Sequence, residues 1–389
     1  MKKLIPYGNH SISEEDIEAV IEVLKSDRLT TGPSVDQFEN VLKNRFGAKH
    51  VNVVSNGTAA LHLAALALGW SKEDVVLTTP MTFLATANCI IYTGSTPDFV
   101  DIDLETYTID LNKLEEKIIA YKNKGEKIKA VIAVDYAGHP CNWEEIRYLA
   151  DTYEFQLMND NCHALGSQYN NDPKYAIKYA DIVTQSFHPV KHITTGEGGA
   201  VVTNNEEYDT KVRQLRTHGI TYDIKLNDQY VGPWYREMIE LGYNYRLTDI
   251  QSALGISQLK RLDDRIKRRQ KLALQYDKRL SQFERFITPL VSNNFKHAYH
   301  LYALQVRFEQ IKIDKRDLFQ KMLEKGIQLQ VHYLPVHLNS YYRKKYGFKH
   351  GDYPNSEKFY NREISLPIYP ELSDNELDYV TNSLVNITS

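Results

Sequence analysis

One lysine, Lys191, stands in a short loop rich in hydroxyl groups and glycine, residues 186–199 (SFHPVKHITTGEGG). A strand-like run, residues 181–187, leads into this loop, and a second one, residues 200–203, follows it. An enzyme that forms a Schiff base needs a lysine that is partly neutral and closely surrounded by backbone, so that its amine can attack a buried aldehyde. A solvated loop lysine produces the same local pattern about as often, so the loop alone leaves both interpretations open.

An aspartate, Asp160, ends another strand-like run, residues 156–160. Open α/β sheets bind ligands at the carboxyl ends of their strands, which is where this side chain would lie. A carboxylate in that place can hydrogen-bond a protonated ring nitrogen and keep it cationic, as pyridoxal 5′-phosphate (PLP) requires to act as an electron sink. The alternative is that Asp160 caps the next helix, a common role for aspartate after a strand.

A third segment, residues 55–61 (SNGTAAL), follows the β-branched run 51–54 and could bind a phosphate group. A strand, a turn of small residues and a helix start leave backbone N–H groups free at the positive end of the helix dipole. Neither the GxxxxGK[ST] spacing nor the GxGxxG spacing of other phosphate loops is present. Ser186 could add a hydroxyl to the same phosphate. A phosphate segment, an acid and a lysine in this order indicate a PLP site more specifically than any one of them.

The elements that carry these residues alternate along the chain from residue 51 to about residue 204. The strand-like runs predict an α/β fold, a mostly parallel central sheet with helices on both faces; they cover residues 51–54, 75–78, 98–102, 129–134, 156–160, 181–187 and 200–203. Beyond them we predict a long helix that bridges two domains, followed by a strand, a helix and a strand; these cover residues 250 to about 280, 301–308, 314–325 and 328–332. Residues 218–243 have few apolar repeats, and we expect an ordered loop that reaches a neighbouring subunit.

Nearly the whole chain, from Tyr7 to about Pro367, resembles the DegT/StrS-type sugar aminotransferases, a branch of the fold-type I PLP enzymes. The lysine loop is the most specific match, and the other matching segments are LTTGP (29–33), SNGTAALHL (55–63), TFLATAN (82–88), VDYAG (134–138), GYNYRL (242–247) and QVHY (330–333). The resemblance implies a PLP-dependent aminotransferase that moves an amino group from an amino acid, with glutamate expected, to a keto carbon of a nucleotide-linked deoxysugar. The expected acceptor carbon is C4 of a UDP-sugar, and the expected pathway makes surface glycans or nonulosonic acids such as pseudaminic acid.

The resemblance also implies a role for single residues. Lys191 would form the Schiff base and then move the proton, and Asp160 would face the ring nitrogen. Further residues would contact the cofactor: Thr58 and Ala59 through backbone N–H groups, Phe83 by stacking, and His163, Ser186 and Asn244. The residues expected to contact the nucleotide-sugar are Tyr7, Arg28, Thr30, Asn56, Arg246, Gln330, Val331, His332 and Tyr333.

Some of these roles have alternatives. Phe83 could be a core aromatic residue at a helix start, and His163 could be a core histidine with satisfied hydrogen bonds. Relatives usually carry small residues after the ring-nitrogen acid, whereas Asn159 and Asn161 flank it here, so we expect local hydrogen bonding to differ. Since Asn244 and Arg246 match the segment that the family takes from a partner subunit, the resemblance implies a homodimer with composite active sites.

Two other functions compete with aminotransfer. A PLP-dependent or PMP-dependent sugar dehydratase has the same fold, but the dehydratase relatives carry histidine in place of the lysine, so Lys191 favours aminotransfer. A regulatory relative that retains the cofactor without turnover is the second alternative. The intact lysine, acid and phosphate segment argue against it.

Length and composition limit the class of protein. At 389 residues the chain suits two unequal domains, a large PLP-binding α/β domain with an N-terminal helical arm (residues 1–255) and a small C-terminal α+β domain (residues 256–389). The net charge of −3 gives no electrostatic reason to expect nucleic acid or anionic membrane as a partner. Three cysteines without CxxC spacing fit a reducing compartment, so we expect a cytoplasmic protein. We expect no signal peptide, membrane span or metal site.

Overall fold

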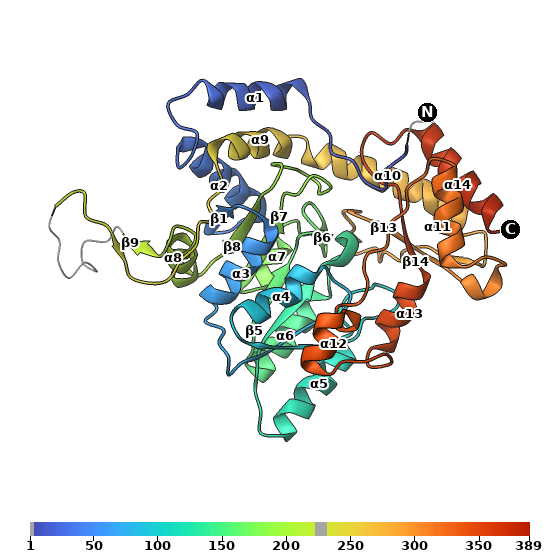
Figure 1. Ribbon diagram of the computed structural model, residues 1–389, viewed down its shortest axis with the longest axis horizontal. Helices are drawn as coiled ribbons and strands as arrows, with labels where there is room; N and C mark the ends of the chain where they lie inside the picture. Colours follow the sequence, from blue (N-terminus) through green and yellow to red (C-terminus); the bar gives the residue numbers. More distant parts are fainter. Residues whose placement is uncertain (1–3, 222–231) are drawn as a thin grey trace.

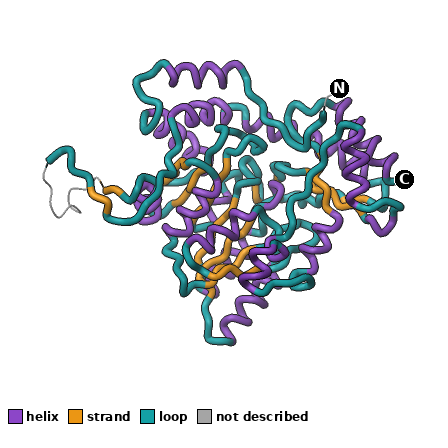
Figure 2. Tube along the Cα trace, in the orientation of Figure 1, coloured by secondary structure: helices purple, strands orange, loops and turns teal. Residues whose placement is uncertain are grey.

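The computed structural model describes residues 4–221 and 232–389, and a seven-stranded sheet forms its centre (Figures 1 and 2). The strands lie in the order β1-β8-β7-β5-β4-β2-β3. β8 runs antiparallel to both of its neighbours, and all the other neighbouring pairs are parallel. The predicted mostly parallel sheet is therefore confirmed. The strands are β1 (His50–Val54), β2 (Val75–Thr78), β3 (Thr96–Phe99), β4 (Ile128–Val134), β5 (Gln156–Asp160), β7 (Ile182–Ser186) and β8 (Gly199–Thr203).

The sheet has two apolar faces, because successive side chains of a strand point to opposite sides. In β4, Val131 and Ala133 belong to one core, whereas Ala130 and Ile132 belong to another. Helices cover both faces, as predicted. The first core includes residues of α2 (Pro33–Phe46), α5 (Leu111–Asn123), α6 (Trp143–Tyr153) and α7 (Tyr175–Tyr179); the second includes residues of α3 (Gly57–Ala67), α4 (Leu84–Tyr92) and α8 (Glu206–Leu215). Outside these layers, α1 (Glu14–Leu24) lies along α9 (Asp249–Leu259) (Figure 1).

The C-terminal part of the chain has its own antiparallel sheet, in the order β11-β13-β14. Its core joins residues such as Leu304 and Ile364 to Leu272 and also to Ile5 from the N-terminal segment. The expected domain division at residue 255 stays a prediction. The elements of this part are α10 (Leu262–Leu280), β11 (Phe286–Ile287), β13 (Tyr302–Val306), η3 (Phe308–Gln310), α11 (Lys315–Glu324), η4 (Val336–Leu338), α12 (Ser340–Tyr346), α13 (Pro354–Arg362), β14 (Glu363–Leu366) and α14 (Asp374–Ile387).

The predicted helix from residue 250 to about residue 280 is wrong in one respect, because it is two helices, α9 and α10. The chain leaves helical geometry at Arg261, where φ is −104° and ψ is 5°. α10 nevertheless joins two cores: Leu262 and Ile266 belong to the core of the large sheet, and Leu272 belongs to the C-terminal core. Its role as a bridge between two domains stays a prediction.

The predicted strand at residues 328–332 is also wrong. Only an isolated bridge forms there, between Gln330 and Ser365. The N–H group of His332 donates to the carboxylate of Glu363 at 3.0 Å, so it has no partner in a strand ladder. β14 supplies the strand that pairs with β13 instead.

Two short strand pairs and the 3₁₀ helix η1 are the remaining described elements. β6 (Gln168–Tyr169) pairs with β12 (Phe295–Lys296), and η1 covers Tyr136–Gly138. β9 (Ile220–Thr221) pairs with β10 (Glu237–Met238), and this pair projects from the body of the protein at the left of Figure 1. It lies within the segment that we expect to reach a neighbouring subunit, of which residues 222–231 lie outside the described part.

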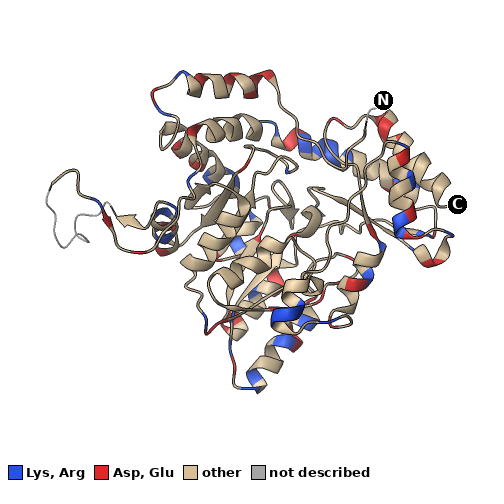
Figure 3. Ribbon diagram, viewed as in Figure 1, with Lys and Arg blue, Asp and Glu red and all other residues tan. Residues whose placement is uncertain are grey.

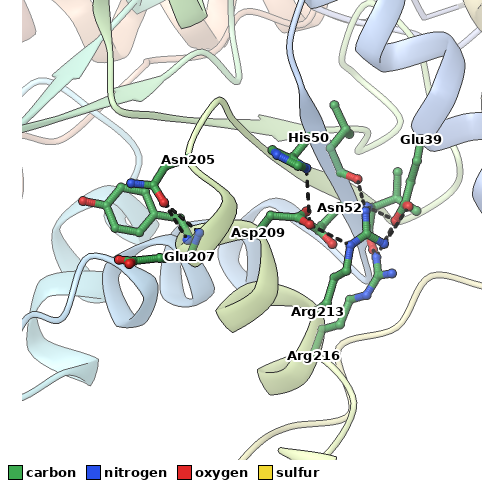
Figure 4. A network of polar contacts seen from close by, with 11 residues as sticks. Glu39, His50, Asn52, Asn205, Glu207, Asp209, Arg213 and Arg216 are labelled. Atoms are coloured by element: carbon green, nitrogen blue, oxygen red, sulfur yellow. Dashed lines mark hydrogen bonds and ion pairs between the residues drawn. The ribbon is translucent and has the colours of Figure 1, made fainter. Parts of the chain in front are cut away.

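A partly buried ionic network ties β1 to α2 and α8 (Figure 4). Glu39 of α2 is 4% exposed, and its carboxylate accepts hydrogen bonds from Arg213 and Arg216 of α8 at 3.2 and 2.6 Å. The same carboxylate accepts from the N–H of Val53 at 3.1 Å, and Arg216 donates to the Val53 carbonyl at 2.8 Å. Arg213 also donates to Asp209 at 3.0 Å. The network therefore fixes the end of β1, from which the chain enters the predicted phosphate segment.

Charged residues of both signs are mixed on the outer helices, among them α10 and α11 (Figure 3). Across residues 4–221 and 232–389, no helix combines the length and the apolar content that crossing a membrane would require.

Candidate active site

A cavity of about 980 Å³ lies at the carboxyl edge of the central sheet. The ends of β4, β5 and β7 contribute Val134, Asp160 and Ser186 to its wall, as expected for a ligand site in an open α/β sheet. Most of the predicted site residues line this one cavity: Tyr7, Asn56, Thr58, Ala59, Phe83, Asp160, His163, Ser186, Lys191, Gln330, Val331, His332 and Tyr333.

Lys191 reaches the cavity from a loop that is closed on itself. At the start of this loop, the N–H of Phe187 donates to the carbonyl of Gly198 at 2.7 Å. Burial lowers the pKa of the Lys191 ammonium below its ordinary value of 10.5, and the neighbouring Cys162 and Asp160 partly oppose this shift. A lowered pKa increases the neutral fraction of the amine, which is the form that attacks an aldehyde.

Asp160 is 5% exposed, and its two carboxylate oxygens are held by different groups. The hydroxyl of Thr86 donates to Oδ2 at 2.6 Å, and Thr86 is itself 2.7 Å from the hydroxyl of Thr82. The N–H of Cys162 donates to Oδ1 at 3.2 Å. Residues 161–167 form turns, and the next helix is α7, so Asp160 does not cap a helix. The carboxylate is therefore oriented at the cavity wall, as its proposed role at a ring nitrogen requires.

The asparagines that flank the acid have a structural role. The side-chain amides of Asn159 and Asn161 both donate to one oxygen of Asp135, at 3.2 and 2.7 Å. The other oxygen of Asp135 accepts from the N–H of Cys141 and the indole N–H of Trp143, at 2.8 and 3.0 Å. Burial raises the pKa of Asp135 to about 6, although these hydrogen bonds oppose the shift. In this chain the two asparagines thus anchor Asp135 behind the end of β5, and the expected difference from relatives stays a prediction.

The predicted phosphate segment begins α3, and Asn56 caps that helix. The side chain of Asn56 accepts from the N–H of Ala59 at 2.8 Å, so Ala59 could donate to a phosphate only if Asn56 released it. The N–H groups of Gly57 and Thr58 belong to the first turn and have no partner within the helix. A Cβ atom on Gly57 would lie 2.8 Å from Cβ of Ser186, and glycine therefore permits the close approach of these two segments.

His163 is buried in the cavity wall as a neutral ring. Its Nδ1 accepts from the N–H of Ala137 at 3.3 Å, which puts the ring proton on Nε2, 3.3 Å from the hydroxyl of Tyr333. Burial, followed by the charge of Lys191, lowers the pKa of His163 well below 6.5. Phe83 is 53% exposed, and its ring centre lies 5.7 Å from that of Tyr333. Phe83 is therefore no core residue, since its ring is exposed at the cavity.

Four predicted site residues do not line the cavity of their own chain: Arg28, Thr30, Asn244 and Arg246. Arg28, Thr30 and Asn244 are exposed. Arg246 forms a backbone bridge with Val54 at the end of β1. The roles of all four residues stay predictions.

Other residues of the cavity were missed by the sequence analysis. Thr86 had a usable signal, since Thr82 and Thr86 are four residues apart at a helix start. His62 and His300 line the cavity, and each has one buried ring nitrogen without a hydrogen-bond partner among the described residues, Nε2 and Nδ1 respectively. No local pattern marks His300, because only the fold brings its segment next to Lys191.

These residues fit PLP. A helix start with free N–H groups and a serine hydroxyl suits the phosphate, a buried carboxylate at a strand end suits the ring nitrogen, and a lysine of lowered pKa suits the aldehyde. The close contact permitted by Gly57 brings the hydroxyl of Ser186 next to the helix start, so that both could contact one phosphate.

Comparison with known proteins also indicates an aminotransferase. The sequence profile of the DegT/DnrJ/EryC1/StrS aminotransferase family matches residues 10–385. A Campylobacter jejuni protein named UDP-4-amino-4,6-dideoxy-N-acetyl-beta-L-altrosamine transaminase is 41% identical over 99% of this chain and 97% of its own length.

Solved structures agree with the sequence comparison. Helicobacter pylori PseC, described as an aminotransferase of pseudoaminic acid biosynthesis, has a TM-score of 0.89 and is 33% identical, over 99% of both chains. Spr1654 of Streptococcus pneumoniae, described as a sugar aminotransferase and solved in a PLP form, has a TM-score of 0.87 and is 28% identical, over 99% of this chain and 98% of its own.

Proposed function

The chain belongs to the DegT/DnrJ/EryC1/StrS aminotransferase family, and on this basis we propose its reaction. It is a PLP-dependent aminotransferase that transfers an amino group from an amino acid, L-glutamate, to the keto carbon, C4, of a nucleotide-linked deoxysugar, a UDP-sugar. Its product serves the synthesis of surface glycans or of nonulosonic acids such as pseudaminic acid. The observation that carries this proposal is the convergence of Lys191, Asp160 and the start of α3 on one cavity.

The residues of the cavity divide the work of this reaction. When bound, PLP supplies an electron sink for the charge that develops at the carbon bearing the transferred nitrogen. Lys191 holds the cofactor aldehyde and then moves the proton at that carbon, which its lowered pKa favours. Asp160, fixed by Thr86, keeps the ring nitrogen protonated. His163 offers Nε2–H to the phenolic oxygen, and the N–H groups at the start of α3 hold the phosphate.

The segment 330–333 and Tyr7 are proposed to bind the nucleotide-sugar, because they line the cavity and belong to no strand of the central sheet. A dehydratase is the weaker proposal. That reaction uses a histidine at the position of Lys191 in related proteins, and a lysine of lowered pKa occupies it here.

We also propose a homodimer with composite sites. Asn244 is exposed and lies outside the cavity of its own chain, and the pair β9–β10, which precedes it, projects from the body. Both features are those of a segment that serves the site of a second copy. Asn244 would then reach the phosphate of the partner, and Arg28, Thr30 and Arg246 would complete the sugar site.

The unpaired state of all three cysteines, Cys89, Cys141 and Cys162, is in keeping with a reducing compartment. We therefore propose that the enzyme acts in the cytoplasm.

The decisive experiment supplies the purified holoenzyme with glutamate and a panel of UDP- and dTDP-4-keto-6-deoxysugars. Glutamate alone should abolish the absorbance of the lysine-bound cofactor, and one keto sugar should restore it while an amino sugar forms. Loss of a sugar hydroxyl without amination would indicate a dehydratase. A cofactor band that no amino donor changes would indicate a protein without turnover.

A further inference from the structure

The backbone and one ring nitrogen of His332 form hydrogen bonds, and only the other ring nitrogen has no partner among the described residues. Its N–H donates to Glu363 at 3.0 Å, and its carbonyl accepts from the hydroxyl of Tyr136. Nδ1 of its ring lies 2.7 Å from the hydroxyl of Ser365, and its ring centre lies 5.3 Å from that of Tyr7. The side chain is therefore fixed in place and orientation at the cavity wall.

The hydrogen-bond chain behind this ring decides where its proton sits. The hydroxyl of Ser365 lies 2.5 Å from Oε1 of Glu363, and it has only one proton to give. A carboxylate accepts and cannot donate, so the Ser365 proton points to Glu363. The hydroxyl oxygen of Ser365 must then accept a hydrogen bond from Nδ1–H of His332. The ring proton is on Nδ1, and Nε2 carries a lone pair.

This assignment requires a negative Glu363 and a neutral His332. Burial raises the pKa of Glu363 to about 7, although the hydroxyl of Ser365, the positive charge of Lys315 and the N–H of His332 oppose this shift. The assignment therefore applies above about pH 7, where Glu363 is a carboxylate. The N–H of His332 donates to one oxygen of Glu363 at 3.0 Å, and the hydroxyl of Ser365 lies 2.5 Å from the other. For His332, burial and then the charge of Lys191 lower the pKa to about 3, so the ring is neutral.

Nε2 of His332 is the nitrogen that remains. No residue among 4–221 and 232–389 forms a hydrogen bond with it, and the atom is not fully buried. His332 lines the cavity together with Gln330, Val331 and Tyr333. Nε2 is therefore open to the cavity, on the wall proposed to bind the sugar.

We infer that Glu363 and Ser365 are positioning residues for the sugar: they fix the proton of His332 on Nδ1, so that Nε2 accepts a hydrogen bond from a hydroxyl or N–H group of the nucleotide-sugar. The inference rests on the proposed function for the identity of this ligand. It assigns a role to two buried residues of β14 that the transfer chemistry itself does not use. It also explains why a buried carboxylate lies behind this wall of the cavity.

The test uses one variant that reverses the direction of the hydrogen-bond chain and one that breaks it. In Glu363→Gln, the carboxamide nitrogen donates to Ser365, whose proton then turns to Nδ1 of His332. Nε2 becomes a donor. Ser365→Ala breaks the chain, Ser365→Thr keeps the hydroxyl, and Thr381→Val is the matched control, since it removes a buried hydroxyl of α14 in the same region.

Two half-reactions of the holoenzyme separate sugar binding from general damage. Both convert the lysine-bound cofactor, one with glutamate and one with UDP-4-amino-4,6-dideoxy-N-acetyl-β-L-altrosamine, and both are followed by cofactor absorbance. We expect Glu363→Gln to raise the half-saturating amino-sugar concentration about 10- to 100-fold and Ser365→Ala about 3- to 10-fold. Ser365→Thr, Thr381→Val and every glutamate half-reaction should stay within about 2-fold.

A second measurement does not depend on the sugar. In protein labelled with ¹⁵N-histidine, the His332 ring resonances are identified by their loss in His332→Gln. At about pH 8.5, where Glu363 is a carboxylate, they should show protonation at Nδ1 in the unchanged protein and at Nε2 in Glu363→Gln.

Three results would overturn the inference. These are a ring proton on Nε2 in the unchanged protein, folded variants that bind the amino sugar normally, or equal losses in both half-reactions. If the unchanged enzyme reacts with glutamate but with no amino sugar, the proposed function fails first, and the substrate role of His332 fails with it.

Discussion

Replacement of Glu39 by alanine should destabilise the protein more than any surface ion pair does. Glu39 is 4% exposed and accepts three hydrogen bonds, from Val53, Arg213 and Arg216 (Figure 4). No other acidic residue joins β1, α2 and α8 in this way within the described part of the chain. The change therefore removes the group that connects three elements beneath the phosphate segment.

The magnitude follows from the groups left behind. The N–H of Val53 loses its partner inside the core, which costs about 1–3 kcal/mol. Arg216 has a side chain only 13% exposed and loses its carboxylate, which adds about 1 kcal/mol after its remaining bond to the Val53 carbonyl is considered. The side chain of Arg213 is 42% exposed and keeps its contact with Asp209, so the loss of its contact with Glu39 contributes little. We expect the free energy of unfolding to fall by about 2–4 kcal/mol.

Urea unfolding measured by circular dichroism, at one protein concentration for all variants, tests this value. The matched control is Asp263→Ala, which removes two hydrogen bonds from Arg45, at 3.1 and 2.7 Å, to an aspartate whose side chain is 66% exposed. That change should cost about 0–1 kcal/mol. If Glu39→Ala and Asp263→Ala lower the free energy of unfolding equally, burial of the network does not determine its strength, and the reasoning is refuted.

Four further predictions concern the site. Lys191→Ala should keep the fold but lose the cofactor adduct that borohydride traps in the unchanged protein; an adduct mapped to any other lysine would contradict the assignment. Asp160→Asn should slow the glutamate half-reaction about 10- to 100-fold while cofactor occupancy changes far less, because a charge-assisted hydrogen bond of about 1.5–3 kcal/mol is lost; a normal rate would rule out the role. Gly57→Ala should weaken PLP binding to the apoprotein about tenfold, measured by fluorescence titration, because its Cβ would lie 2.8 Å from Cβ of Ser186; unchanged affinity would exclude that contact from the phosphate site. Lys191→Ala and Asn244→Ala chains, each nearly inactive alone, should regain part of the activity when they are mixed, because one site of the heterodimer carries both native residues. Verified heterodimers without recovered activity, or a fully active monomer, would refute composite sites.

The local sequence was sufficient for most of the central sheet, although the run predicted at residues 98–102 is displaced from β3, which covers Thr96–Phe99. Its strands are short runs of β-branched and apolar residues separated by turns, and buried parallel strands require this pattern wherever they occur. The predicted run at residues 156–160 has the same bounds as β5, and the run at 75–78 has the same bounds as β2. Lys191 and Asp160 could be placed on the cavity for the same reason, since both follow strands whose carboxyl ends meet at one edge of the sheet.

Where the sequence pattern failed, a tertiary contact overrode it. The apolar repeat continues through residues 250–280, yet the helix breaks at Arg261, so that α9 can pack on α1 and α2 while α10 packs on α14. The run at 328–332 has strand-like residues, but the N–H of His332 bonds to the side chain of Glu363 and not to a neighbouring strand. Periodicity reports which face of a segment is apolar and contains no information about what that face will meet.

The sequence by itself therefore determined the fold class, because strand-like and helical runs alternate over about 150 residues. It also singled out the lysine, the acid and the predicted phosphate segment that line the cavity, because each lies in a pattern of about a dozen neighbouring residues. Only the tertiary structure decided that Thr86 fixes Asp160 and that Glu363 and Ser365 stand behind His332. These partners are separated by 74 positions in the first case and by about 30 in the second. A hydrogen bond depends on distances of about 3 Å between atoms, and residues so far apart along the chain reach such distances only when the two cores have packed.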